Sequence, residues 1–290
     1  MSYTLASGRT LGVVGESGCG KSMTALAVIG LVPHPGSVGG AVRFAGRDLL
    51  GQDAAAWRAL RGDRVAMVFQ EPMTALNPTM PVGRQVAEAM VLHGRAGWRA
   101  AGERAVDWLA LVGIAAARAR AADYPHQLSG GMRQRAMIAM ALACEPDLLI
   151  ADEPTTALDV TIQAQILDLL QDMQARMGMA MQFISHNLAV VSGLADTILV
   201  MYAGRVVEQA PAAALFAAPL HPYTRGLIAT LPDPARREER LPVIPGSVAA
   251  RAAQGCRFAP RCPIAAPDCR AAEPELIEKA PGHRVACIKA

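Results

Sequence analysis

The sequence predicts an α/β protein built on a mostly parallel sheet, and three observations predict it. Short apolar runs alternate with segments of helical composition, a glycine-rich stretch joins the first run to a helical segment, and a later run ends in two carboxylates. Buried runs that alternate with helices are typical of parallel strands covered on both faces. The predicted strands are 11–14, 65–69, 148–151, 180–184 and 198–201.

The helical segments indicate how the chain is organised. Residues 22–29 follow the glycine-rich stretch, and segments at about 83–93, 101–112 and 131–144 fill the space between the second and third strands. We therefore expect a helical insertion over about 71–144, in a main domain of residues 1–230. Residues 231–246 are rich in proline and charge, which predicts a linker leading into a C-terminal extension over 231–290.

Composition excludes several classes of protein. The 290 residues carry 28 Lys and Arg against 25 Asp and Glu, a net charge of +3, so nucleic acid is not an expected partner. Mean hydropathy is +0.24, but no stretch reaches the roughly 18 apolar residues of a membrane span. There is no signal-peptide pattern, and the six cysteines are therefore expected to be reduced thiols, metal ligands or reactive groups.

Residues 15–22, here called the phosphate loop, match the pattern G-x-x-x-x-G-K-[ST] between a predicted strand and a predicted helix. Backbone N–H groups of such a loop point at phosphate oxygens, and the next helix adds the positive end of its dipole. Lys21 should reach the β- and γ-phosphates, and Ser22 should bind Mg²⁺. Cys19 is interpreted as a tolerated small residue. The expected phosphate contacts are Gly15, Glu16, Ser17, Gly18, Cys19, Gly20, Lys21 and Ser22.

Two carboxylates follow the strand at 148–151. Asp152, at the carboxyl end of a strand, is placed to hold Mg²⁺, whereas Glu153 can polarise a water for attack on the γ-phosphate. Such a pair is usually only a solvated loop, but a phosphate loop elsewhere in the chain favours the functional interpretation.

A second anion site is predicted at Ser129, Gly130 and Gly131, which open the helical segment at 131–144. A short hydroxyl and two glycines expose N–H groups at a helix start, although an ordinary capped helix looks the same. The chain thus carries two separate half-sites for phosphate.

Together these motifs resemble the ABC-type ATPases over nearly the whole chain. The phosphate loop looks like Walker A, residues 148–153 like Walker B and residues 128–132 like the signature motif. The resemblance places Gln70 in the Q-loop, as a further Mg²⁺ ligand and catalytic residue, Ala157–Asp159 in the D-loop, and His186 as the switch histidine at the γ-phosphate. It implies ATP and Mg²⁺ as cofactors and a head-to-tail pair of ATPase chains, each ATP lying between one Walker A and the partner's signature.

Further segments, 73–78, 124–129 and 159–165, resemble the dipeptide, oligopeptide and nickel importers. This implies the ATPase subunit of a peptide importer, peripheral on the cytoplasmic face of the membrane, with nickel import as the alternative. The implied partners are a second ATPase subunit, two permease subunits that contact residues 71–80, and an extracellular substrate-binding protein. A soluble ATPase acting on nucleic acid or ribosomes is disfavoured because coiled-coil arms are missing. A redox-sensing module is the third candidate.

Four cysteines gather near the C-terminus, at Cys256, Cys262, Cys269 and Cys287. Four thiolates can hold zinc or an iron–sulfur cluster, but this spacing matches neither the usual zinc pattern nor the ferredoxin runs. Residues 216–224 and 260–263 resemble the C-terminal extension of peptide-importer ATPases, which implies a 4Fe-4S cluster, with zinc as the alternative.

Overall fold

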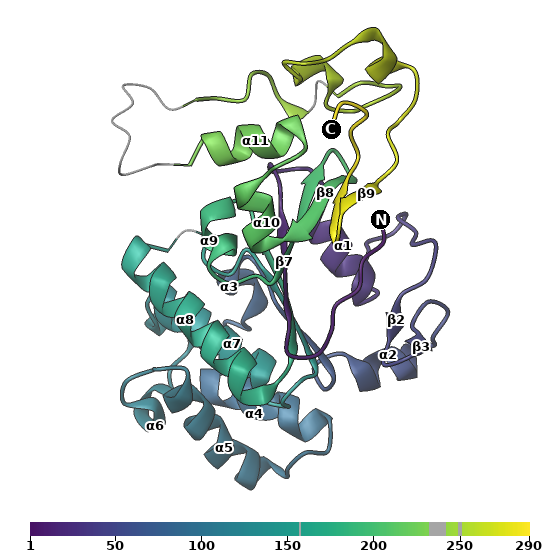
Figure 1. The fold of residues 1–290 in the computed structure, drawn as a ribbon. Coiled ribbons are helices and arrows are strands. Elements are labelled where there is room, and N and C mark those ends of the chain that lie inside the picture. The colour runs from purple at the N-terminus through teal and green to yellow at the C-terminus, as the bar shows by residue number, and fades with distance from the viewer. Residues whose placement is uncertain (157, 232–241, 249–250) are drawn as a thin grey trace. The chain divides into compact units, whose positions relative to one another are not determined.

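The computed structural model describes residues 1–156, 158–231, 242–248 and 251–290 (Figure 1). These residues divide into two compact units. Unit 1 comprises Met1–Leu5, Thr10–Ser22 and Phe183–Ala290, and unit 2 comprises Ala6–Arg9 and Met23–Gln182. Each unit is therefore assembled from segments that lie far apart in the sequence.

Unit 1 contains five strands that pair side by side. In spatial order they are β1 (Thr10–Val14), β7 (Thr197–Tyr202), β8 (Arg205–Pro211), β10 (His283–Val285) and β9 (Ile277–Ala280). The pairing of β1 with β7 is parallel, and the pairings of β7 with β8, β8 with β10 and β10 with β9 are antiparallel. Strand β1 is buried along its whole length and β7 is buried beyond its first residue, which is why their sequences are runs of apolar residues.

The helices of unit 1 are short. They are α9 (Leu188–Ser192), α10 (Ala212–Ala217), α11 (Pro222–Ala229) and the 3₁₀ turns η3 (Ala259–Arg261) and η4 (Pro267–Arg270). Three buried aromatic rings join them to the strands: Tyr202 of β7 contacts Tyr223 of α11 and Phe258, with ring centroids 4.9 and 5.1 Å away. The C-terminal segment therefore shares the hydrophobic core of unit 1.

Unit 2 contains the strands β4 (Val65–Val68) and β5 (Leu148–Asp152), which pair in parallel. It also holds a small hairpin, β2 (Arg43–Phe44) with β3 (Arg47–Asp48), and the helix α2 (Ala54–Leu60). The division between the units cuts two elements, α1 (Lys21–Val28) and β6 (Ala180–Ser185).

The remaining helices of unit 2 lie mostly between β4 and β5 in the sequence. They are α3 (Pro72–Ala75), α4 (Val82–Leu92), α5 (Trp98–Leu111), α6 (Ala117–Arg120), η1 (Pro125–Gln127) and α7 (Gly130–Leu142), and α8 (Val160–Met177) follows β5. Helices α4, α5 and α7 pack against one another, with alanines and Met90 among their buried residues. The predicted helices at 83–93, 101–112 and 131–144 are confirmed with small shifts of their ends.

The sheet is mixed, so the prediction of a mostly parallel sheet is confirmed only for the pairs β1–β7 and β4–β5. Ala203 and Gly204 form a two-residue turn, with φ of +46° and +83°, that reverses the chain from β7 into β8. The C-terminal hairpin of β9 and β10 then adds two more antiparallel pairings. Of the predicted linker at 231–246, residues 232–241 lie outside the described residues.

None of the helices in the described part of the chain combines the length and the apolar character needed to cross a membrane.

Candidate functional site

The predicted site residues fall into both units. The phosphate loop and His186 belong to unit 1, whereas Gln70, Asp152 and Glu153 belong to unit 2 together with Ser129–Gly131 and Asp159.

The phosphate loop connects β1 to α1, as the sequence predicts. Close packing requires Gly15, because a Cβ atom at that position would overlap the carbonyl oxygen of Met201 in β7. Gly20 has φ of +101°, which side chains other than glycine rarely allow. Behind the loop, the N–H of Gly204 in the β7–β8 turn donates to the carbonyl of Cys19 at 2.8 Å. The loop is thus held from the strand side by backbone contacts.

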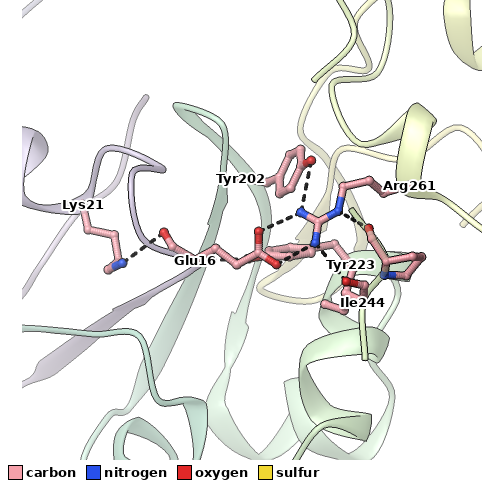
Figure 2. Close-up of polar contacts among 7 residues, drawn as sticks. Glu16, Lys21, Tyr202, Tyr223, Ile244 and Arg261 are labelled. Carbon is pink, nitrogen blue, oxygen red and sulfur yellow. Dashed lines mark hydrogen bonds and ion pairs between the residues drawn. The ribbon is translucent and has the colours of Figure 1, made fainter. Parts of the chain in front are cut away.

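Lys21 begins α1 and is buried, with 5% of its surface exposed. Its ammonium group donates to the carbonyl oxygen of Gly15 at 2.8 Å. It also donates to the carbonyl oxygen of Glu16 at 3.3 Å (Figure 2). The cation is therefore held inside the curl of the loop, next to the positive end of the α1 dipole, where an anion is favoured.

Cys19 is buried, with 1% of its surface exposed. Burial raises the pKa of its thiol, and the opposing effect of the nearby Lys21 ammonium is smaller. The protonated, buried thiol is unreactive, which agrees with Cys19 as a small residue that the loop tolerates.

Glu16 is held by two residues to which the sequence analysis gave no role (Figure 2). Its carboxylate accepts hydrogen bonds from the two terminal nitrogens of Arg261, at 2.7 and 2.9 Å. Its backbone N–H donates to the phenol oxygen of Tyr223 at 2.9 Å. Arg261 and Tyr223 lie in segments that carried the family resemblance, but no local pattern connects them to residue 16.

In unit 2 the structure brings Gln70 and Glu153 together. The side-chain amide of Gln70 lies 3.5 Å from a carboxylate oxygen of Glu153. The parallel register explains the approach, because Val68 of β4 is paired with Ala151 of β5 and both side chains lie two residues beyond that pair. Since the carboxyl ends of parallel strands meet at one edge of a sheet, the residues that follow β4 and β5 become neighbours there.

Asp152 and Glu153 differ in their surroundings. Asp152 is the last residue of β5 and has 4% of its surface exposed. Glu153 is half-buried and has φ of +46°, an unusual conformation for a residue with a side chain. Thr156 donates from its hydroxyl to the Glu153 carboxylate at 2.9 Å. The two adjacent carboxylates thus leave the strand in different environments, as separate roles require.

Ser129 and Asp159 cap the helices α7 and α8. The Ser129 hydroxyl accepts from the N–H of Met132 at 3.3 Å, and the Asp159 carboxylate accepts from the N–H of Ile162 at 2.9 Å. Both residues are exposed. Ala157, the first residue of the expected D-loop, lies outside the described residues.

The starts of α7 and α8 approach each other. A Cβ at Gly131 would meet Ile162 at 3.0 Å, and Arg135 donates to the side chain of Gln165 at 2.8 Å one turn further along. Because both contacts advance in the same direction, the helices run parallel and their N-terminal ends share one edge of unit 2. Two positive dipole ends there favour an anion.

His186 follows β6 and is exposed. The next residue, Asn187, caps α9 through its side-chain oxygen, which accepts from the N–H of Ala189 at 3.0 Å, and its own N–H donates to Ser185. His186 therefore lies at a fixed turn between a buried strand and a short helix.

All six cysteines are free thiols. The four C-terminal ones line one small cavity with His221, here called the cysteine cavity. No three histidine, cysteine or acidic side chains of the described residues lie close enough together to hold a single metal ion. The described residues therefore show no ready-made metal site at these four cysteines.

The His221 imidazole adds a hydrogen-bond donor to the cysteine cavity. Burial and, to a smaller extent, the nearby Arg225 lower the pKa of His221 to about 4, so the ring is neutral at pH 7. Its Nδ1 accepts from the N–H of Tyr223 at 3.0 Å, so the proton lies on Nε2. This Nε2 is buried and has no hydrogen-bond partner among the described residues. An unsatisfied donor beside four thiols fits an acceptor such as a cluster sulfide.

The chain is similar to known proteins in both its N-terminal and its C-terminal parts. Residues 1–156 match the family model described as ABC transporter, and residues 207–269 match the model for the oligopeptide/dipeptide transporter C-terminal region. The dimeric ATP-binding cassette MJ0796, in a post-hydrolysis state bound to ADP and Pi, is similar with a TM-score of 0.64 and 27% identity, over 72% of this chain and 88% of that one. By its class, the protein is an ABC-type ATPase.

Curated relatives extend over almost the whole chain. A probable peptide ABC transporter ATP-binding protein from Sinorhizobium fredii is 55% identical, over 99% of this chain and 87% of its own length. The dipeptide transport ATP-binding protein DppD of Escherichia coli is 50% identical, over 99% of this chain and 89% of its own length. The chain therefore belongs to the ABC transporter ATP-binding proteins of the oligopeptide/dipeptide group, and the resemblance noted from its motifs is confirmed.

Proposed function

We propose that this chain hydrolyses ATP to drive an ABC importer of dipeptides or oligopeptides. The observation that carries this proposal is the identity of 50 to 55% across 99% of the chain with proteins named for peptide and dipeptide transport. The match of residues 207–269 to the oligopeptide/dipeptide C-terminal region supports the same substrate class. This similarity favours peptide import over two alternatives. The alternatives are nickel import by a related transporter and a soluble ATPase without a transporter.

The site residues receive the following roles in this proposal. The N–H groups of residues 15–22 and the Lys21 ammonium bind the β- and γ-phosphates, and Ser22, Gln70 and Asp152 hold Mg²⁺. Glu153 accepts a proton from the attacking water, and His186 contacts the γ-phosphate. The approach of Gln70 to Glu153 at 3.5 Å supports a shared task for these two side chains.

A second ATPase chain, distinct from this one, is proposed to complete each ATP site. Ser129, Gly130, Gly131 and Asp159 would contact the partner's nucleotide, which the exposed and parallel starts of α7 and α8 support. Two permease subunits and an extracellular binding protein complete the importer, and the chain lies on the cytoplasmic face of the membrane. Residues 1–230 form the ATPase domain with a helical subdomain at about 71–144, and 231–290 form the cysteine-containing extension. Nucleic acid has no part in the proposal.

Cys256, Cys262, Cys269 and Cys287 are proposed to hold a 4Fe-4S cluster, with zinc as the alternative. The cysteine cavity and the unsatisfied Nε2 of His221 support the larger group. A cluster bound there supplies a covalent cross-link among parts of the extension. Iron, acid-labile sulfide and zinc are measured on protein purified without oxygen, with a Cys262→Ser variant as the matched control. Protein that contains zinc, or no metal at all, contradicts the cluster.

The importer assignment is tested by purifying the tagged chain in mild detergent from its own cells. We expect two multi-spanning permeases and a second ATPase to copurify. ATP hydrolysis by this complex in lipid should rise when the binding protein is added with dipeptide, and not with nickel. Copurification with ribosomal proteins alone contradicts the importer assignment. If nickel but not dipeptide stimulates ATP hydrolysis, the transported substrate is nickel and not peptide.

A further inference from the structure

Within the C-terminal extension, the short segment Cys256–Cys262 contacts the phosphate loop. Its first and last residues line the cysteine cavity, and its two arginines face the loop and the turn behind it. All of these residues belong to unit 1. The extension and the phosphate loop are thus parts of one compact body, although 245 residues separate Glu16 from Arg261.

Arg261 makes the main contact. Its side chain is 4% exposed, and its two terminal nitrogens pair with the Glu16 carboxylate. Its Nε donates to the carbonyl of Pro245 at 2.7 Å, and the fork also reaches the carbonyl of Ile244 at 3.3 Å (Figure 2). A two-pronged pair of this kind defines the position of both partners, because the planar fork matches the carboxylate only in one orientation.

The backbone that carries Arg261 is itself anchored. Phe258 is buried, with 2% of its surface exposed, and packs against the rings of Tyr202, Tyr223 and His221. The pair with Glu16 raises the pKa of Arg261 further above its already high value, so the guanidinium stays charged at every physiological pH. The arginine is therefore a fixed positive charge behind the phosphate loop.

Arg257 makes the second contact, with the turn that supports the loop. Its guanidinium donates to the carbonyl of Ala203 and pairs with Glu273 at 2.8 Å. The next residue of that turn, Gly204, donates its N–H to the carbonyl of Cys19. The Cys256–Cys262 segment thus braces the loop at Glu16 directly and at Cys19 through the turn.

Glu16 explains why the brace matters for a loop that binds phosphate. A carboxylate in this loop repels the negative charge of a nucleotide unless a cation compensates it. The loop must also keep its curl, because a loop that is already in its binding conformation loses less entropy when the ligand binds. Arg261 has both effects. It compensates the negative charge of Glu16, and it holds the loop in its conformation by joining Glu16 to the folded extension.

We infer that Arg261 is a positioning residue for nucleotide binding, which acts through Glu16 and makes the ATP affinity of the loop depend on the folded C-terminal extension. The inference rests on the proposed ATP-binding function of the chain. Arg261 itself does not touch the nucleotide in this role.

The test is equilibrium binding of MgATP to the full chain, measured by displacement of a fluorescent ATP analogue. We expect Arg261→Gln to lower the affinity about tenfold, because the Glu16 carboxylate is left uncompensated and the loop is released. Arg261→Lys keeps the charge but not the fork, so its loss should be smaller. Arg270→Gln, an exposed arginine of the same extension, is the matched control and should bind ATP as the native chain does.

A double-mutant cycle tests the route through Glu16. If Arg261 acts by compensating that carboxylate, the variant carrying both Glu16→Gln and Arg261→Gln should bind ATP no worse than Arg261→Gln alone. In the assembled transporter, Arg261→Gln should raise the KM for ATP by the same factor while kcat changes little, since uniform binding is what is lost. Thermal unfolding without nucleotide separates these effects from loss of the fold.

The outcomes are distinguishable. A folded Arg261→Gln chain that binds ATP like the Arg270→Gln control overturns the inference, and so do losses that simply add in the double variant. A native chain that binds no ATP under any condition overturns the proposed function instead. If Arg261→Gln fails to fold, the ATP affinity of the Arg261→Lys variant is the test. Native ATP affinity in Arg261→Lys would show that the two-pronged pair with Glu16 is not required for nucleotide binding, which overturns the inference.

Discussion

Glu153 combines a strained backbone with a precise set of contacts. Its positive φ of +46° costs about 1 kcal/mol or more for a residue with a side chain. The surrounding structure maintains it, because Thr156 and Gln70 both reach the same carboxylate oxygen. Glu153 is proposed to be the catalytic base. Backbone strain at such a residue indicates that the orientation of its carboxylate, and not only the presence of a carboxylate, is under constraint.

We expect Glu153→Gln to bind MgATP with nearly native affinity but to hydrolyse it at least about 100-fold more slowly, because the amide cannot accept the proton of the attacking water. The amide keeps the hydrogen bond from Thr156, so the backbone should keep its conformation. Hydrolysis by the purified transporter and ATP binding by the isolated chain are the measurements.

Glu103→Gln serves as the control for this experiment. Glu103 is an exposed residue of α5 that pairs with Arg118 on the surface, and its substitution should leave hydrolysis unchanged. Turnover of Glu153→Gln at the rate of this control would remove Glu153 from the mechanism.

At the scale of elements, the parallel arrangement of α7 and α8 gives Gly130 and Gly131 different surroundings. A Cβ at Gly131 would press on Ile162 at 3.0 Å, whereas a Cβ at Gly130 would meet no described atom within 4 Å. Packing inside the chain therefore explains the glycine at 131 but not the one at 130. The open face of Gly130 is consistent with the close approach of a ligand from a partner subunit.

Substitutions at the two glycines should have different effects. We expect Gly131→Val to lower the free energy of unfolding by about 1 to 3 kcal/mol through overpacking, and the added Ile162→Ala to restore part of that loss. Gly130→Ala should leave stability unchanged or slightly raised, because alanine favours helices. Urea unfolding of the chain measures both effects.

The effect of Gly130→Ala on ATP hydrolysis should be opposite to its effect on stability. Gly130→Ala should reduce ATP hydrolysis by the assembled transporter although the chain is fully folded. Native hydrolysis in this variant would show that the start of α7 does not approach the nucleotide.

At the scale of the whole molecule, one buried carboxylate ties the extension to the core of unit 1. Glu208 of β8 has no exposed surface and accepts hydrogen bonds from the N–H groups of Leu220 and His221, and it lies 2.7 Å from Nε2 of His283 in β10. It therefore joins β8, the start of α11 and the C-terminal hairpin. A carboxylate without solvent depends on every one of these donors.

Glu208→Ala should lower the free energy of unfolding by about 3 to 5 kcal/mol, because it leaves three donors, two of them buried, without an acceptor. Glu275→Ala, at an exposed position of the extension, should change it by less than about 0.5 kcal/mol. Urea unfolding followed by circular dichroism compares the two. Equal stability of both variants would mean that the hydrogen bonds of Glu208 contribute nothing to the stability of unit 1.

Local patterns predicted the elements that carry strong apolar signals. All five predicted strands and the helices of the insertion are present because buried parallel strands and amphipathic helices have their own periodicities. Strand β9 was missed because all four of its residues are exposed and show no apolar pattern. Strand β8 was missed because polar residues interrupt it and its pairing through the Ala203–Gly204 turn defines it.

The motifs alone determined the chemistry of this protein. A phosphate loop, an acidic pair and a glycine-rich helix start require particular residues at short spacings. Such short spacings can be recognised in the amino-acid sequence alone. The residues that contact those motifs in the folded chain could not be predicted from the sequence in the same way. The meeting of Gln70 with Glu153 depends on the register of two strands, and the brace of Arg261 on Glu16 joins residues from opposite ends of the chain. Only tertiary structure decides such contacts, because folding brings together side chains that no local pattern relates.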